Sequence, residues 1–456
     1  MKHPIILVAF LLLPLLAFSQ GVTFEQGSWK DALALAKQTD KPVMLYISFS
    51  DEEISRSIDE SMNKYVFARE TVGEVCKTYF VCYRMDASKK EGFDLAKKYG
   101  LAKRPVVLFV NADGRVLSIM QTSMSDTNFM EGAKKVLLDL KAPKPITAWE
   151  AEYTKMKKDT TFLLEYINKR IDLGLSINEA FDAYLRLFPA NGPMSKQAAT
   201  LFQSNAHRLL VSDYAYEYFF KNKQAYSIAI ASVSGNKPVE DNFVFRKVVD
   251  HTVDVATLLE DDALLEKAVT VFQQIPKDFL MRKQAEEYYL DFYKKNNNLE
   301  KYLAHARLFA ADIMKKLDSE ELLMKDDVSY LNLKKQRASE TDSARIKSLD
   351  RSIKSRPDLE RSQLCSSMND IAGYVGYTFS KASIIEEALG WSDKAVQACP
   401  TITFFLDTNA QILYKLGRKE EAVAMEKRAV ANFQGSPTYT RFTDTLKKME
   451  AGENTW

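Results

Sequence analysis

The pattern of apolar and polar positions changes near residue 141. Before that point, short continuous apolar runs alternate with segments in which apolar residues recur every three or four positions. The apolar runs, which predict strands, are 43–49, 80–85, 105–110 and 115–121. The segments with helical spacing are 24–37, 66–75, 93–99 and 129–140. From residue 148 onward almost every segment has helical spacing, so the pattern predicts an α/β domain followed by an all-α region.

Two turn signals add detail to the α/β domain. Asn111-Ala112-Asp113-Gly114 separates the third and fourth apolar runs, so these two predicted strands should form a hairpin. Gly100 follows the helix predicted over 93–99, and glycine suits a left-handed cap at a helix end.

The first residues have the features of a signal peptide. Lys2 precedes an apolar run over 5–18, and Ala17 and Ser19 are the small residues that a signal peptidase reads. The run is shorter than the roughly 20 apolar residues that cross a bilayer. We therefore expect residues 1–19 to be removed and the remaining chain to be exported to the periplasm, the cell envelope or the medium, without an integral membrane segment.

Charge and cysteine content exclude several classes of function. Lys and Arg number 63 and Asp and Glu 61, a net charge of +2, so the chain lacks the basic excess of a nucleic-acid-binding protein. The four cysteines (76, 82, 365 and 399) include no Cys-x-x-Cys pair, and the four histidines are scattered. The sequence therefore predicts no nucleic-acid partner, no metal site and no cofactor.

An ordered set of residues in the α/β domain resembles a known family. The set comprises Trp29, Ala32, Ala36, Lys41-Pro42-Val43, Met62, Val66-Phe67, Val72-Gly73, 86–92, 95–100, Arg104-Pro105 with the strand that follows, and Asp113-Gly114. Together these residues resemble the exported thioredoxin-like proteins of Bacteroidetes. The resemblance implies a thioredoxin-like fold over residues 20–141, but a fold alone does not give an activity.

The redox motif of that family is absent. Active members carry Cys-x-x-Cys after the first strand, at a helix start that lowers the thiol pKa. Counting back from Met62 places Arg56 and Asp59 roughly where the two thiols would be. Neither side chain exchanges a disulfide. The family also holds a cis-proline beside its active site, and the residue before that proline pairs with an extended peptide. The resemblance therefore implies no catalytic residue, and it makes a candidate peptide-binding set of Ser50, Asp51, Arg104 and Pro105.

Cys76 and Cys82 are the only thiols of the α/β domain. They are expected to be small core residues, a structural disulfide that joins a helix end to a strand, or a redox pair. The third interpretation would make the protein a thiol-disulfide oxidoreductase.

The helical region follows a short proline-containing linker over 142–147. We predict an α-helical domain over 148–360, as one domain or two, and tetratricopeptide-like repeats over 361–456. The repeat prediction depends on Ala388 and Ala395, which recur 34 residues later as Ala422 and Ala429, because 34 residues is the period of that motif.

Helical arrays of this type bind an extended peptide or another protein. We therefore expect an exported, redox-inactive interaction or chaperone-like module with a protein or peptide partner. A thiol-disulfide oxidoreductase that uses Cys76 and Cys82 is the alternative, and a scaffold within an envelope complex is the third hypothesis.

Overall fold

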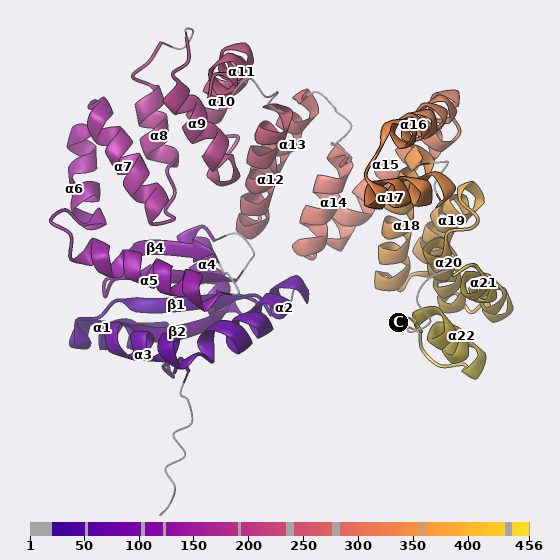
Figure 1. Ribbon diagram of the computed structural model, residues 1–456. Helices are drawn as coiled ribbons and strands as arrows, with labels where there is room; N and C mark the ends of the chain where they lie inside the picture. The colour runs from indigo at the N-terminus through magenta and orange to yellow at the C-terminus, as the bar shows by residue number, and fades with distance from the viewer. Residues whose placement is uncertain are drawn as a thin grey trace, which may run out of the picture. The chain divides into compact units, whose positions relative to one another are not determined.

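The computed structural model describes residues 21–50, 53–101, 105–121, 125–189, 193–233, 241–275, 283–355, 359–433 and 440–455. The predicted signal peptide lies outside these ranges. The chain forms two compact units, one that ends at Lys283 and one that begins at Gln284. Figure 1 shows that the strands belong to the first unit, and that helices make up the second.

The four predicted strands are confirmed and form one mixed sheet. They are β1 (Val43–Ser48), β2 (Val81–Asp86), β3 (Val106–Val110) and β4 (Val116–Gln121). Their order is β2-β1-β3-β4, with β1 parallel to β2 and the other two pairs antiparallel. The predicted β3–β4 hairpin is therefore correct, and Asn111 closes it by accepting hydrogen bonds from the N–H groups of Asp113 and Arg115 at 3.1 and 2.8 Å.

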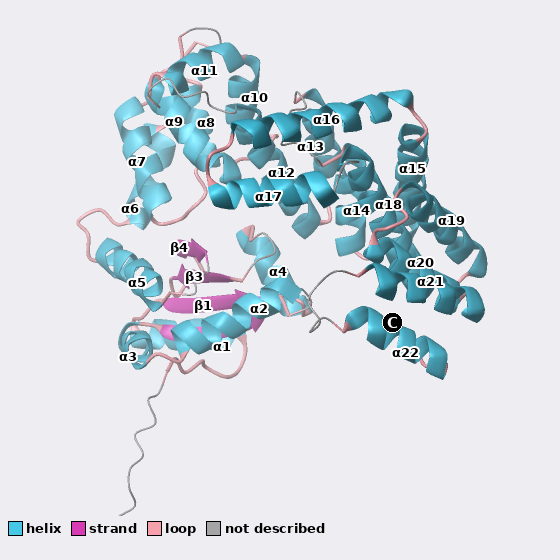
Figure 2. Ribbon diagram, turned by 45° about the vertical axis from the view of Figure 1, so that its right-hand side comes forward, coloured by secondary structure: helices cyan, strands magenta, loops and turns pink. Residues whose placement is uncertain are grey.

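Helices cover both faces of the sheet (Figure 2). They are α1 (Trp29–Thr39), α2 (Glu53–Met62), the π-helical turn η1 (Asn63–Phe67), α3 (Glu70–Tyr79), α4 (Lys90–Tyr99) and α5 (Asp126–Leu140). One face buries Val43, Leu45 and Ile47 with residues of α1 and α4. The other face holds Tyr46, whose ring packs on Phe67 of η1 at 5.0 Å. All six residues of β1 are buried, as its continuous apolar run predicted.

Capping decides where two of the predicted helices begin and end. Ser28 accepts a hydrogen bond from the Asp31 N–H and caps α1, so this helix begins at Trp29 and not at the predicted residue 24. Phe24 packs against Phe67 at 5.3 Å instead. At the end of α4, Gly100 has φ of 64°, the left-handed conformation that the sequence predicted.

The predicted linker over 142–147 does not separate two structural units. Helix α6 (Ile146–Met156) begins within it. The buried Asp139 carboxylate, at the end of α5, accepts a hydrogen bond from the Ile146 N–H at 3.0 Å and pairs with Lys169 at 2.5 Å. These contacts fix the start of the helical region to the helix that ends the predicted α/β domain.

Contacts with β4 and with the sheet face extend this unit further. The Leu173 carbonyl accepts hydrogen bonds from the Ile119 N–H at 3.0 Å and from the Ser118 hydroxyl at 2.7 Å. Leu258 is fully buried in the same apolar cluster as β1 and α1. The boundary therefore falls near Lys283, because residues well beyond 148 complete the core of the sheet.

The helical prediction for the rest of the first unit is confirmed. Its elements are α7 (Thr160–Asp172), α8 (Asn178–Leu185), α9 (Lys196–Asn205), the 3-10 turn η2 (Ala206–Arg208), α10 (Tyr214–Lys221), α11 (Lys223–Ala231), α12 (Asp241–Leu259) and α13 (Asp262–Gln274). Phe202, Phe219, Tyr226 and Phe245 form a buried aromatic core among α9 to α12, with the Phe202 and Phe219 rings stacked at 4.1 Å. The aromatic clusters that the sequence shows here are thus packing residues.

The second unit is helical throughout its described residues. Its elements are α14 (Ala285–Lys295), α15 (Leu299–Leu317), α16 (Glu320–Ser339), α17 (Ser343–Ser355), α18 (Leu359–Thr378), α19 (Ala382–Ala398), α20 (Thr403–Lys415), α21 (Lys419–Asn432) and α22 (Arg441–Ala451). The four alanines that recur at 34 residues, Ala388, Ala395, Ala422 and Ala429, are all fully buried. Small residues at these places allow consecutive helices to approach closely.

Candidate functional site

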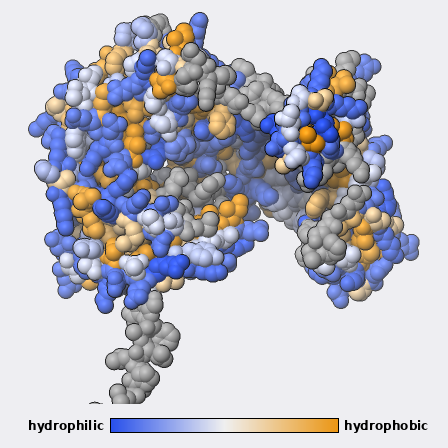
Figure 3. All heavy atoms as spheres, in the orientation of Figure 1, coloured by the Kyte–Doolittle hydropathy of each residue, from blue (hydrophilic) through white to orange (hydrophobic). Residues whose placement is uncertain are grey.

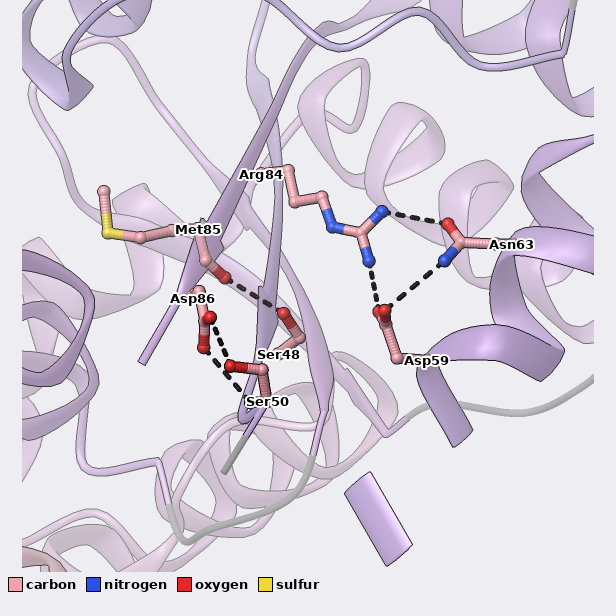
Figure 4. A network of polar contacts seen from close by, with 7 residues as sticks. All are labelled: Ser48, Ser50, Asp59, Asn63, Arg84, Met85 and Asp86. Atoms are coloured by element: carbon pink, nitrogen blue, oxygen red, sulfur yellow. Dashed lines mark hydrogen bonds and ion pairs between the residues drawn. The ribbon is translucent and has the colours of Figure 1, made fainter. Parts of the chain in front are cut away.

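The carboxyl ends of β1 and β2 lie side by side because these strands are parallel. Ser50 follows β1, and its hydroxyl donates to the Asp86 carboxylate at the end of β2 at 2.6 Å. The Ser50 N–H also donates to Asp86, at 3.2 Å. Ser88 adds its own N–H and hydroxyl to the same carboxylate at 3.0 and 2.8 Å. Figure 4 shows the Ser50–Asp86 contacts at the end of the two strands.

These four donors keep Asp86 ionised. Partial burial acts to raise its pKa, but the hydrogen bonds from Ser50 and Ser88 outweigh it and lower the pKa of Asp86 to about 2. The carboxylate is thus a fixed anchor for the chain that follows β1. At neutral pH it has no proton to give as a general acid, and a group with so low a pKa is a weak general base.

Two further predicted site residues lie at this end of the sheet. The Arg56 guanidinium, on α2, donates to the Ser50 carbonyl at 2.9 Å. Val106 of β3 pairs with Ile47 of β1 in the antiparallel register, so Pro105, directly before β3, lies at the end of the sheet where β1 ends. The structure therefore brings Ser50, Arg56 and Pro105 to one edge. Asp51 and Arg104 were predicted for the same site and lie outside the described residues.

Asp59 belongs to a different set of contacts. Its carboxylate forms an ion pair with Arg84 of β2 and accepts a hydrogen bond from the Asn63 amide at 3.4 Å. The Arg84 guanidinium also donates to the Asn63 oxygen at 2.9 Å (Figure 4). It lies over the ring of Tyr46 at 5.1 Å. Burial, together with the nearby Asp59 carboxylate, raises the pKa of Tyr46. This network ties α2 and η1 to the sheet, so Asp59 has a structural partner.

Cys76 and Cys82 are close together in the core. Both are free thiols, with 1% and 4% of their surface exposed. A hydrogen bond that the Cys82 thiol donates to Cys76, followed by burial, raises the pKa of Cys82. A raised pKa and the lack of access both oppose thiolate attack. The described geometry therefore agrees with the interpretation of these residues as core residues.

The sequence interpretation did not select Asp86, Ser88 or Arg84 as site residues. Asp86 had a usable signal, because it ends a predicted strand parallel to the one that precedes Ser50. The carboxyl ends of parallel strands meet at one edge of a sheet. Arg84 had no such signal. Its partners, Asp59 on α2 and Asn63 on η1, lie 25 and 21 residues earlier in the chain.

No known protein-family model matches the chain, and no curated protein is significantly similar to it in sequence. Among the described helices, none is both long enough and apolar enough to cross a membrane. The described ranges also contain no group of three or more His, Cys, Asp or Glu residues arranged to hold a metal ion. The surface drawn in Figure 3 is mainly hydrophilic, with small separate groups of apolar residues.

Proposed function

We propose that this protein is an exported, redox-inactive thioredoxin-like protein that binds an extended polypeptide at the carboxyl ends of β1 and β2. In this proposal it acts as an interaction or chaperone-like module. The observation that carries the proposal is that Ser50, a predicted peptide-binding residue, is held by Asp86 and Ser88 just after β1, with Arg56 on its carbonyl. A mixed four-stranded sheet with helices on both faces is consistent with the fold that the resemblance implies.

The surroundings of Ser50 favour contact with a polypeptide. Ile54, in the first turn of α2 and two positions before Arg56, leaves 74% of its surface exposed. An extended chain that lies along this edge would meet an apolar side chain and the guanidinium of Arg56. Peptides bind folded domains in this way, with main-chain hydrogen bonds for affinity and side-chain contacts for selectivity.

A binding experiment with matched surface variants tests the proposal. The probe is a fluorescent polypeptide kept unfolded by reduction and carboxymethylation, and anisotropy reports its binding to the chain from residue 20. Ile54→Ser should weaken binding by about tenfold, because it removes most of the apolar area of one contact side chain. Ile228→Ser is the control, since Ile228 on α11 is 66% exposed in the same unit and far along the chain from α2. Equal losses in both variants, or no binding by the wild type, would contradict the proposal.

The second candidate function is thiol-disulfide exchange through Cys76 and Cys82. The specific observation in its favour is that the two thiols lie within hydrogen-bonding distance of each other. Insulin-disulfide reduction by the wild-type chain, abolished by Cys76→Ser, would support it. Their burial predicts instead that wild type and variant show the same background rate.

A further inference from the structure

A cluster of basic side chains lies on η2 and α12, away from the sheet site along the chain. It consists of His207 and Arg208 on η2, and of Lys247 and His251, which stand one turn apart on α12. The Val211 N–H donates to the Thr252 hydroxyl at 2.9 Å, which fixes the chain after η2 to α12 next to His251. The four side chains are thus held together by rigid elements.

Arg208 has one N–H donor group with a hydrogen-bond partner and one buried N–H donor group without a partner among the described residues. Its Nε donates to Nε2 of His207 at 3.1 Å. Its Nη1 is buried and has no hydrogen-bond partner among the described residues. A buried, unsatisfied donor on a charged group is costly, and burial lowers the pKa of the Arg208 guanidinium. Nη1 therefore adds to the positive charge of the cluster that no group among the described residues compensates by a hydrogen bond.

The charges that act on the two imidazoles have one sign. Burial, Arg208 and Lys247 lower the pKa of His207. Burial, His207 and Arg208 lower the pKa of His251 to about 4. Of the carboxylates on α12 near this cluster, Asp250 pairs with Arg246 at 3.6 Å, and Asp254 is exposed. The cluster therefore lacks a compensating anion among the groups that perturb it.

We propose that His207, Arg208, Lys247 and His251 form a binding site for a phosphate-type oxyanion. The guanidinium offers a fixed positive charge with N–H donors, the lysine offers an ammonium, and a neutral histidine still offers one ring N–H. A tetrahedral oxyanion carries acceptors in several directions, so it satisfies donors that come from two elements, whereas one arginine fork is sufficient for a carboxylate. His207 is exposed and the other three are partly exposed, so a small anion has access.

Anion-dependent stability of the full chain tests this site first. Sodium phosphate replaces sodium chloride at constant ionic strength, and thermal unfolding gives an apparent dissociation constant. The wild type should gain stability with phosphate, and Arg208→Gln should weaken binding by at least about tenfold, because it removes a charge-assisted donor. Arg246→Gln is the control, since Arg246 lies on the same helix but pairs with Asp250. An equal loss in the control, or no preference for phosphate over chloride, would overturn the proposal.

Histidine NMR of the wild-type chain locates the anion directly. The chain contains four histidines, of which His305 is in the second unit. Phosphate should shift the ring signals of His207 and His251 and leave His305 in place, and Lys247→Gln should reduce the shifts. O-phosphoserine in a parallel titration distinguishes a phosphate ester from the free ion, since only a site open to esters responds to both. Unmoved signals of His207 and His251 under phosphate would refute the assignment.

Discussion

Glu426 gives the sharpest prediction about stability. It lies on α21 between Ala422 and Ala429, is fully buried, and neither carboxylate oxygen has a hydrogen-bond partner among the described residues. The nearest charges are Asp407, also fully buried, and Arg441, which already pairs with Asp407 at 2.9 Å. Burial, and then the Asp407 carboxylate, raise the pKa of Glu426 to about 8 against the opposing effect of Arg441.

The direction of the pH dependence follows from this pKa. The folded chain holds the Glu426 proton up to about pH 8, whereas the unfolded chain loses it near the ordinary value of 4.5. Stability is therefore complete below pH 4.5, falls as pH rises, and levels off above about pH 8. At about 1.4 kcal/mol for each pH step, the loss at pH 7 is on the order of 3 kcal/mol. Glu426→Gln removes the titrating group, so the variant should lack this loss.

Urea unfolding of the full chain between about pH 5 and pH 8 measures the effect, with hydrogen exchange of peptides from α21 to localise it. The advantage of Glu426→Gln over the wild type should grow by about 3 kcal/mol across this range. Asp407 and Tyr377 face the same group, and both remain in the variant, so their own titration largely cancels. Glu420→Gln, at an exposed position of the same helix, should show no such trend. A difference between wild type and Glu426→Gln that stays constant with pH would refute the reasoning.

Three further outcomes are expected. The thiols of Cys76 and Cys82 are 1% and 4% exposed, so they should react with a colorimetric thiol reagent only in denaturant. Rapid reaction under native conditions would contradict their burial. Gly174→Ala should destabilise the first unit by at least about 2 kcal/mol in urea unfolding, because Gly174 has φ of 71° and a Cβ there would lie 1.9 Å from a backbone oxygen of β4. Ser50→Ala should raise the pKa of Asp86 from about 2 toward 3.8, as carboxyl NMR would measure. A depressed carboxyl pKa stabilises the fold above pH 3.8, so the stability advantage of the wild type over the variant should disappear as pH falls toward 2.

The sequence identified the sheet elements well because each carries its own local signal. A continuous apolar run bounded by turn residues predicted β1 as a buried strand, and all of it is buried. A glycine after a helical segment predicted a left-handed cap, and Gly100 adopts it. The 34-residue recurrence of alanine likewise predicted buried small residues, which Ala388 and Ala422 are.

The same patterns were less informative about polar residues on apolar faces. Glu426 falls on the stripe formed by Ala422 and Ala429, at a place where helical spacing predicts a core residue. The sequence pattern alone does not say whether such a glutamate reaches solvent, forms an ion pair or is buried without a partner. Only the packing of α21 shows it buried beside Asp407.

By itself, the sequence determined which segments become strands and helices, and which small residues repeat. Tertiary structure decided the partners: Asp59 pairs with Arg84, Ser50 with Asp86, and residues as distant as Leu173 and Leu258 complete the sheet region. The physical reason is that periodicity encodes which side of one element is buried. The choice of partner, and therefore the site and the unit boundary, depends on elements far apart in the chain that meet only when it folds.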